Sequence, residues 1–597
     1  MPDLRTYRVA LLIAVLLAAG ALVALRPPQS VTVSTQPTVF DPQAAAGDLR
    51  ALATDFPGRV AGSATDRQAA TWVAAQLATD GLQTHVDAFA SEVAGRRVEL
   101  ANVWAISTGT AAGSIVVLAP RDSPPRSTQG ANDDASGTAC LLELASVFAG
   151  SAHIHPIVFV SSDGDTNGAL GAHEFLARHG DLDILAVVAL RRVAGRDVHS
   201  ITLNGWSAQP RLAPPWLWGL GEASGQAGAG LRTPLPPVTT QLVRLAVPSG
   251  GGSQAPFVAA GLPAIELSAP GAAVPAVGDT LDTVSTDTLL RSGRAAELLV
   301  ASLDAAPTPL AGSGHTVFFS RFRQLSGGFV VWILIVLMLP LAAVSVAMTA
   351  RAVRRRLPLR HAVVRLALRV APWLLTLTLV YLANLLGLLP GGFGAALSPD
   401  ALVSHAPHYL RVVLILLFLA VTYHYAMAIE HRLARRFPTD TDAVVTVTHL
   451  ALLLAALVML TIDPFSLLLV LPAALLWPIA RRGAWPRSAL PVWAGLAVIA
   501  ASIVYLGDRL HLGWDVWWYF FLLLETRTIP MTAVVLAVIF VAAAALLSHE
   551  LHVPKAAERG ATERGATERT RRPLRSGRAA TRRRLRERPP AAEGRPH

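Results

Sequence analysis

Carboxylate side chains gather in the polar loops of one stretch of the sequence, between residues 120 and 170. Asp122, Asp133, Asp163 and Asp165 are the members that could do chemistry. Carboxylates serve as general bases and as ligands of metal ions that activate water. The chain has a single cysteine, Cys140, so an intramolecular disulfide and a four-cysteine zinc site are both excluded. A metal site here would therefore use His, Asp and Glu.

Short apolar runs separate these loops and predict buried strands. The runs are continuous rather than alternating, which is typical of strands covered on both faces. They cover residues 114–119, 156–160, 184–190 and 264–267, with helical patterns at 135–148 and 170–179 between them. A further helix is expected after Ser63, which begins a capping pattern with Asp66. Residues 46–305 are thus predicted to form an α/β domain with a mostly parallel central sheet flanked by helices.

The sequence changes to long apolar segments after residue 327. Hydrophobic residues make up 52% of the chain and charged residues only 15%, which excludes a disordered chain and argues against a purely soluble protein. Seven segments approach the roughly 20 residues that cross a bilayer. They are residues 328–350, 363–389, 410–429, 444–462, 465–480, 490–506 and 531–548. We expect an all-α domain of seven spans over residues 328–548, in which 465–480 is short.

The N-terminal apolar stretch, residues 9–25, is borderline in length for a span. We expect an uncleaved signal anchor within residues 1–26, with a cleavable signal peptide as the alternative. Residues 27–45 and 306–327 are predicted to be linkers, the first because it is rich in Pro, Ser, Thr and Gln. Counting the anchor, the sequence predicts eight spans.

Arginine-rich loops alternate with arginine-poor loops along the membrane segments. The positive-inside rule places the rich loops and the tail in the cytoplasm, and the α/β domain outside the cytoplasmic membrane. The tail, residues 549–597, is expected to be disordered, and residues 555–597 hold nine of the eleven net positive charges. The charge therefore indicates no nucleic-acid partner for the folded part, and the expected partner is the lipid bilayer. Arg365 and Arg369 begin a span and are expected to extend to the membrane surface.

Five segments of the α/β region occur in an order and spacing that resemble family twenty-eight of the metallopeptidases. They are Phe56–Ser63, Gly130–Gly137 with the sequence GANDDASG, Gly168–Ala172, Pro256–Ala264 and Asp279–Val284. This family comprises di-zinc aminopeptidases and their carboxypeptidase relatives, and several members also carry multiple membrane spans. The resemblance covers about half of the chain and implies a zinc-exopeptidase fold.

The resemblance also implies two zinc ions, bridged by one Asp and a water, with a general base beside them. Asp133 stands at the bridging position and Asp165 at the general-base position. The remaining ligand positions are substituted, by Pro120, Thr166, Arg191 and Pro275. One of five ligands is left, whereas zinc usually needs at least three from the protein. We therefore expect no bound zinc, and a salt bridge between Arg191 and Asp133 in its place.

Three interpretations of the domain remain open at this point. The first is a non-catalytic module outside the membrane, which binds peptides or another membrane protein or is purely structural. The second is an active exopeptidase with zinc in a displaced site built on Asp122, Asp133, Asp163 and Asp165 with a nearby His. The third is a metal-independent hydrolase or a cleft without function. A rival of another class is a transport or scaffold protein that acts through its membrane helices.

Overall fold

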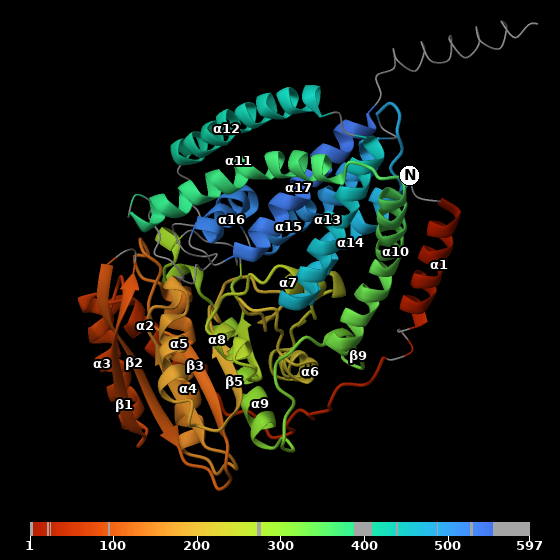
Figure 1. Ribbon diagram of the computed structural model, residues 1–597. Coiled ribbons are helices and arrows are strands. Elements are labelled where there is room, and N and C mark those ends of the chain that lie inside the picture. Colours follow the sequence, from red (N-terminus) through yellow and green to blue (C-terminus); the bar gives the residue numbers. More distant parts are fainter. Residues whose placement is uncertain are drawn as a thin grey trace, which may run out of the picture.

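The computed structural model describes residues 4–552, apart from 21–22, 24, 94–95, 272–275, 387, 389–408, 438–439, 486–487, 511, 526–528 and 530. An α/β domain comes first and a bundle of apolar helices follows it (Figure 1). Pro275 and nearly all of the basic tail lie outside the described residues.

A seven-stranded mixed sheet with the order β1-β2-β4-β3-β5-β7-β6 forms the centre of the α/β domain. Its strands are β1 (Gln83–Val93), β2 (Arg96–Ser107), β3 (Ser114–Pro120), β4 (Ile157–Ser162), β5 (Ile184–Leu190), β6 (Thr202–Asn204) and β7 (Ala264–Ser268). The pairs β4-β3, β3-β5 and β5-β7 are parallel, which confirms the four predicted strands and the parallel centre. The unpredicted strands β1, β2 and β6 pair antiparallel at the two margins.

Helices cover both faces of this sheet. They are α2 (Pro42–Asp55), α3 (Ala64–Thr79), α4 (Ser136–Ala149), α5 (Leu170–Arg178), α6 (Pro215–Ser224), α7 (Val238–Ala246), α8 (Ala255–Ala259) and α9 (Thr286–Asp304). Alternate residues of β3 belong to different hydrophobic clusters, because successive side chains of a strand point to opposite faces. Ile115 and Val117 pack with one cluster, and Val116 and Leu118 pack with the other.

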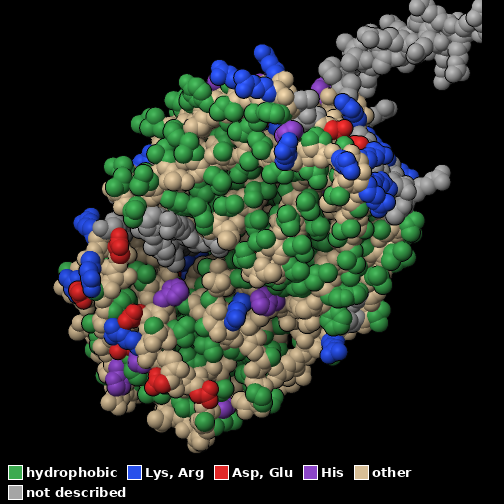
Figure 2. Space-filling model, viewed as in Figure 1, with side chains coloured by type: hydrophobic (Ala, Val, Ile, Leu, Met, Phe, Trp, Pro, Cys, Tyr) green, Lys and Arg blue, Asp and Glu red, His purple; other side chains and the backbone are tan. Residues whose placement is uncertain are grey.

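The helical half contains eight helices beyond the N-terminal α1 (Leu4–Gly20), among the residues described. They are α10 (Gly327–Arg354), α11 (Leu359–Leu385), α12 (Tyr409–Arg436), α13 (Thr441–Ile462), α14 (Leu467–Leu476), α15 (Leu490–Arg509), α16 (Val516–Glu525) and α17 (Met531–Leu551). Six of them, α10, α11, α12, α13, α15 and α17, are long and apolar enough to cross a membrane. The expected short span is α14 with a 3-10 turn at each end, over Pro464–Ile479. Hydrophobic side chains cover most of this half on the face shown in Figure 2.

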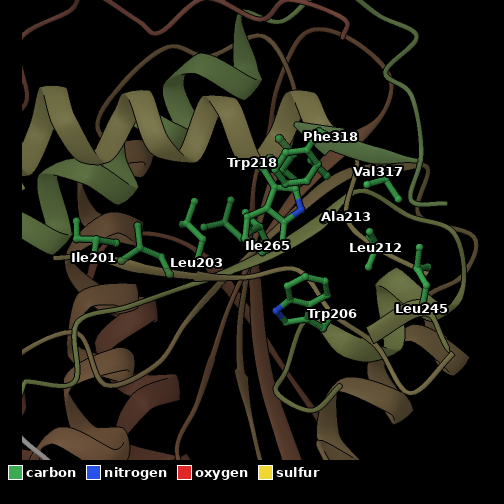
Figure 3. Packing of buried hydrophobic residues seen from close by; sticks show 14 of the residues in the cluster. Ile201, Leu203, Trp206, Leu212, Ala213, Trp218, Leu245, Ile265, Val317 and Phe318 are labelled. Atoms are coloured by element: carbon green, nitrogen blue, oxygen red, sulfur yellow. The ribbon is translucent and has the colours of Figure 1, made fainter. Parts of the chain in front are cut away.

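The two halves share one hydrophobic core at their junction. Trp206 and Trp218 lie 5.4 Å apart between ring centroids, and Trp218 lies 5.8 Å from Phe318 of strand β8 (Val317–Ser320), which pairs with β9 (Arg323–Leu325) (Figure 3). The same cluster continues into α10 and α14. Figure 1 shows the turns at the amino ends of β3 and β4, in orange, at the end of the domain farthest from the membrane helices. The carboxyl ends of these strands therefore point towards the helical half.

Candidate functional site

The sequence-predicted site residues meet at the carboxyl ends of the parallel strands, where ligands of open α/β sheets usually bind. Asp122 follows β3, Asp165 follows β4 and Arg191 follows β5. Asp133 belongs to the loop that leads into α4. We call this group, together with Asp134, the cleft cluster.

Arg191 is the centre of the cleft cluster. Its Nη2 lies 3.3 Å from Asp133 Oδ1, and its Nε lies 3.3 Å from Asp134 Oδ2 and 3.4 Å from Asp165 Oδ2. Only 4% of the Arg191 residue is exposed. The ion pair with Asp133 agrees with the expectation from sequence, and the structure adds two carboxylates that the sequence did not assign to Arg191.

The loop of Asp133 is held by backbone hydrogen bonds to buried charges. Asp279 accepts from the backbone N–H groups of Asn132 and Asp133, both at 2.9 Å. Arg59, which is fully buried, donates to five backbone carbonyls, including those of Gln129 and Gly130 at the start of this loop. The position of Asp133 is thus fixed by the chain itself.

Thr166 faces Asp122 rather than the centre of the cluster. Its Oγ1 donates to Asp122 Oδ2 at 2.8 Å, and the same carboxyl accepts from the backbone N–H groups of Asp165 and Thr166. Asp165 in turn accepts a 2.5 Å hydrogen bond from Ser253 Oγ, a residue with no exposed surface. Asp165, which stands at the general-base position, is therefore already hydrogen-bonded to the hydroxyl of Ser253 and close to the guanidinium of Arg191.

A second buried arginine, Arg121, follows β3 directly before Asp122 of the cleft cluster. Arg121 makes two 3.0 Å bonds to Asp66 and lies 3.6 Å from Asp163. Ser63 caps α3 as expected, because its Oγ accepts from the backbone N–H of Asp66 at 3.1 Å. The carboxylate of Asp66, however, pairs with Arg121 instead of completing the cap. Sequence reasoning missed this pair, since the two residues are 55 positions apart.

Acids outnumber cations in and around the cleft cluster, and burial shifts their titration. Burial raises the pKa of Asp122 to about 7, and the charge of Asp165 adds to this effect. Burial also raises the pKa of Asp134 well above its usual range, with the charge of Asp133 acting in the same direction. Burial raises the pKa of Asp163 to about 9, and the charge of Asp66 acts in the same direction while that of Arg121 opposes it. These buried carboxyl groups therefore keep their protons to a higher pH than a free aspartate does.

The residues present do not fit a pair of zinc ions. Pro120 has no side-chain donor, and its carbonyl accepts from Thr138 Oγ1 at 2.9 Å. Arg191 places a fixed positive charge within 3.4 Å of the carboxylates that would have to bind the metals. Over the part of the chain that the structure describes, no three His, Cys, Asp or Glu residues are arranged to hold a metal ion. Pro275, the remaining substituted position, lies outside the described residues.

Residues 102–300 match the sequence profile of Peptidase family M28. The α/β domain is M28-like. The match contains β3, β4, β5 and β7 and every member of the cleft cluster, and it begins within β2, so α2, α3 and β1 lie outside it. No curated protein sequence matches the chain significantly.

Solved structures of zinc aminopeptidases and of a glutaminyl cyclase are similar to the M28-like domain. An aminopeptidase from Aneurinibacillus sp. strain AM-1 is 14% identical, with a TM-score of 0.39, over 46% of this chain and 96% of that chain. A zinc aminopeptidase from Bacillus subtilis is 14% identical, with a TM-score of 0.38, over 44% and 95%. A glutaminyl cyclase from an Acidobacteriales bacterium is 19% identical, with a TM-score of 0.38, over 46% and 99%.

A second charged cluster, which we call the membrane cluster, lies among the apolar helices outside the M28-like domain. Glu430 of α12 accepts from Arg365 Nε at 2.9 Å and from Arg369 Nε at 3.0 Å, both on α11. Arg365 Nη1 also lies 2.5 Å from Glu550 Oε1 of α17. The two arginines thus join three helices, whereas the sequence suggested that they extend to the membrane surface. Two glutamates near the ends of distant helices were the signal that could have revealed this cluster.

Proposed function

We propose that the M28-like domain is a non-catalytic module that stands outside the cytoplasmic membrane on a multi-pass helical base. One observation carries the first part of this proposal. The guanidinium of Arg191 lies among Asp133, Asp134 and Asp165, where an M28 enzyme would need metal ions and an unobstructed base. The domain then serves as a structural or peptide-binding module rather than as a peptidase.

Electrostatics support this reading over an active enzyme. A divalent metal about 4 Å from a unit positive charge is repelled by about 8 kcal/mol at an effective dielectric of about 20. Zinc would therefore have to displace Arg191 from all three carboxylates. Arg191 has little room to leave, because its residue is 4% exposed. A displaced zinc site built on Asp122, Asp133, Asp163 and Asp165 meets the same obstacle, since Arg191 contacts two of the four.

Activity measurements on the purified full chain test the loss of catalysis. We expect no hydrolysis of aminoacyl or dipeptide substrates above the rate without protein, and no change when a chelator or zinc is added. Arg191→Asp, which restores a carboxylate at this position, serves as a matched variant, and it should remain inactive because Pro120 and Thr166 still lack the donors. Hydrolysis by the wild-type chain that a chelator abolishes would refute the proposal.

The placement of the domain outside the membrane rests on the alternation of arginine-rich and arginine-poor loops. A reporter that is active only outside the cytoplasmic membrane, fused after Arg588, should be silent, while one fused after Ala46 should be active. An active reporter after Arg588 and a silent one after Ala46 would show that the orientation is the reverse of the proposed one. The argument about Arg191 would not be affected.

A further inference from the structure

Arg244 of α7 is a buried cation at the junction between the M28-like domain and the membrane helices. The residue is 8% exposed. Its Nη1 donates to the carbonyl and hydroxyl oxygens of Ser249, at 3.0 and 3.4 Å, and its guanidinium lies 5.4 Å from the ring centroid of Trp206. Its Nε is buried and has no hydrogen-bond partner, and no described carboxylate pairs with it. Buried charges in proteins are normally paired, so this one lacks an anion.

A second arginine comes close to Arg244 from the membrane side. Thr240, one turn before Arg244 on α7, hydrogen-bonds through its hydroxyl to the hydroxyl of Tyr505 on α15, at 2.5 Å. Arg509, one turn after Tyr505, places its guanidinium 5.3 Å from the centroid of the Tyr505 ring. Burial lowers the pKa of Arg244 to about 10, and the charge of Arg509 acts in the same direction. The two cations therefore lie near enough to repel each other.

The two arginines lie at the level of the membrane surface. The apolar part of α15 ends just before Asp508, which is exposed, and Arg509 follows directly. Trp514 and Trp517, a few residues later, are 84% and 42% exposed. Exposed tryptophans concentrate where lipid headgroups meet the hydrocarbon region. The anion most abundant at this depth is the phosphate of a phospholipid.

We propose that Arg244 and Arg509 form a binding site for the phosphate group of a phospholipid, in the leaflet that borders the M28-like domain. A guanidinium matches a phosphate with two parallel N–H groups, and such charge-assisted bonds are stronger than neutral ones. The exposed Arg509 would meet the headgroup first and Arg244 would hold it at the junction. This site rests on the membrane placement of the helices and is independent of whether the M28-like domain is catalytic.

The binding experiment uses the purified, delipidated full chain in a neutral detergent. Phosphatidylglycerol, a diacylglycerol with the same acyl chains and inorganic phosphate are added in turn, and retained ligand is counted by native mass spectrometry beside the thermal unfolding midpoint. We expect phosphatidylglycerol to bind and to raise the midpoint, and the other two to do neither. If the diacylglycerol binds and raises the midpoint as much as phosphatidylglycerol does, only the acyl chains are recognised. Equal effects of inorganic phosphate would show a free-anion site. Either result overturns the proposal.

Substitutions identify the residues that hold the phosphate. Arg244→Gln should weaken phosphatidylglycerol binding about tenfold or more, the effect of losing a hydrogen bond to a charged group. Arg509→Gln should weaken it about threefold, because the side chain is exposed. Arg321→Gln, which removes another exposed guanidinium that stacks on a ring, is the matched control and should bind as the wild type does. If Arg244→Gln fails to fold, wild-type affinity in Arg509→Gln would still refute the site.

Discussion

The cleft cluster and the membrane cluster are built from the same two kinds of side chain, yet their charges balance differently. In the cleft cluster one cation, Arg191, contacts three aspartates. In the membrane cluster two arginines face two glutamates, Glu430 and Glu550. The first arrangement leaves an excess of acid, and the second leaves none.

The difference shows how each environment tolerates buried charge. An apolar bilayer offers no water to compensate an unpaired ion, so intramembrane charges occur in pairs. The cleft lies in the M28-like domain rather than among the apolar helices, and there protonation can neutralise surplus carboxylates. Burial accordingly raises the pKa values of Asp122 and Asp134. The cleft cluster should therefore respond to pH and depend strongly on its single cation.

Removing that cation should have the largest effect. Arg191→Gln leaves Asp133, Asp134 and Asp165 without their shared partner, and breaking a buried ion pair in this way costs about 3–5 kcal/mol. We expect a clear loss of stability of the M28-like domain in chemical or thermal unfolding of the full chain. Arg196→Gln, an exposed arginine five positions on, is the matched control and should be within about 0.5 kcal/mol of wild type. An Arg191→Gln chain as stable as the control would show that the cleft cluster does not depend on its single cation.

Removing the central acid of the membrane cluster should have a smaller effect. Glu430→Gln leaves Arg369 without a carboxylate while Arg365 keeps Glu550, and buried polar interactions in membranes are worth at most about 2 kcal/mol. α12 should become more accessible to protease or to crosslinkers, because apart from this cluster it packs mainly on α11. Glu550→Gln should perturb α12 less, since Glu550 lies on α17 and pairs with Arg365 of α11. Protection of α12 that is unchanged in Glu430→Gln would show that packing alone holds it.

The stability of the M28-like domain should fall as the pH rises from about 4 to about 7. Asp122 has a raised pKa of about 7 in the folded chain, against 3.8 for the ordinary group. In this window the folded state binds more protons than the unfolded state, so unfolding becomes easier as protons are removed, by up to roughly 1.4 kcal/mol per pH unit for one group. Asp122→Asn should make the free energy of unfolding depend less on pH in this range. A wild-type unfolding midpoint that rises with pH over the same range would contradict the raised pKa of Asp122.

Asp133→Asn should have the smallest effect. The Asp133 side chain is 19% exposed, and Arg191 keeps Asp134 and Asp165 after the substitution. The expected loss is about 1 kcal/mol or less, as for a partly exposed ion pair. A loss as large as that of Arg191→Gln would show that Asp133 is the dominant partner, as the sequence alone suggested.

The sequence predicted the centre of the fold better than its margins. Strands β3, β4, β5 and β7 are continuous apolar runs because both of their faces are buried. β1 buries one of its eleven residues, Phe89, and its Val86 is 58% exposed, so it left no apolar run to detect. The pair Arg191–Asp133 followed from the motif positions, since both align with metal-binding places. The pairs Arg121–Asp66 and Arg369–Glu430 join residues 55 and 61 positions apart with no motif between them, so only the folded chain reveals them.

Zinc binding by the purified full chain tests the central claim most directly. The chain is stripped of metal, titrated with zinc by calorimetry at pH 7 and analysed for bound metal after dialysis. The account predicts no stoichiometric zinc, in the wild type and in Asp133→Asn alike, because Arg191 already occupies the carboxylates. Two zinc ions per chain, bound tightly by the wild type and lost in a folded Asp133→Asn variant, would contradict it.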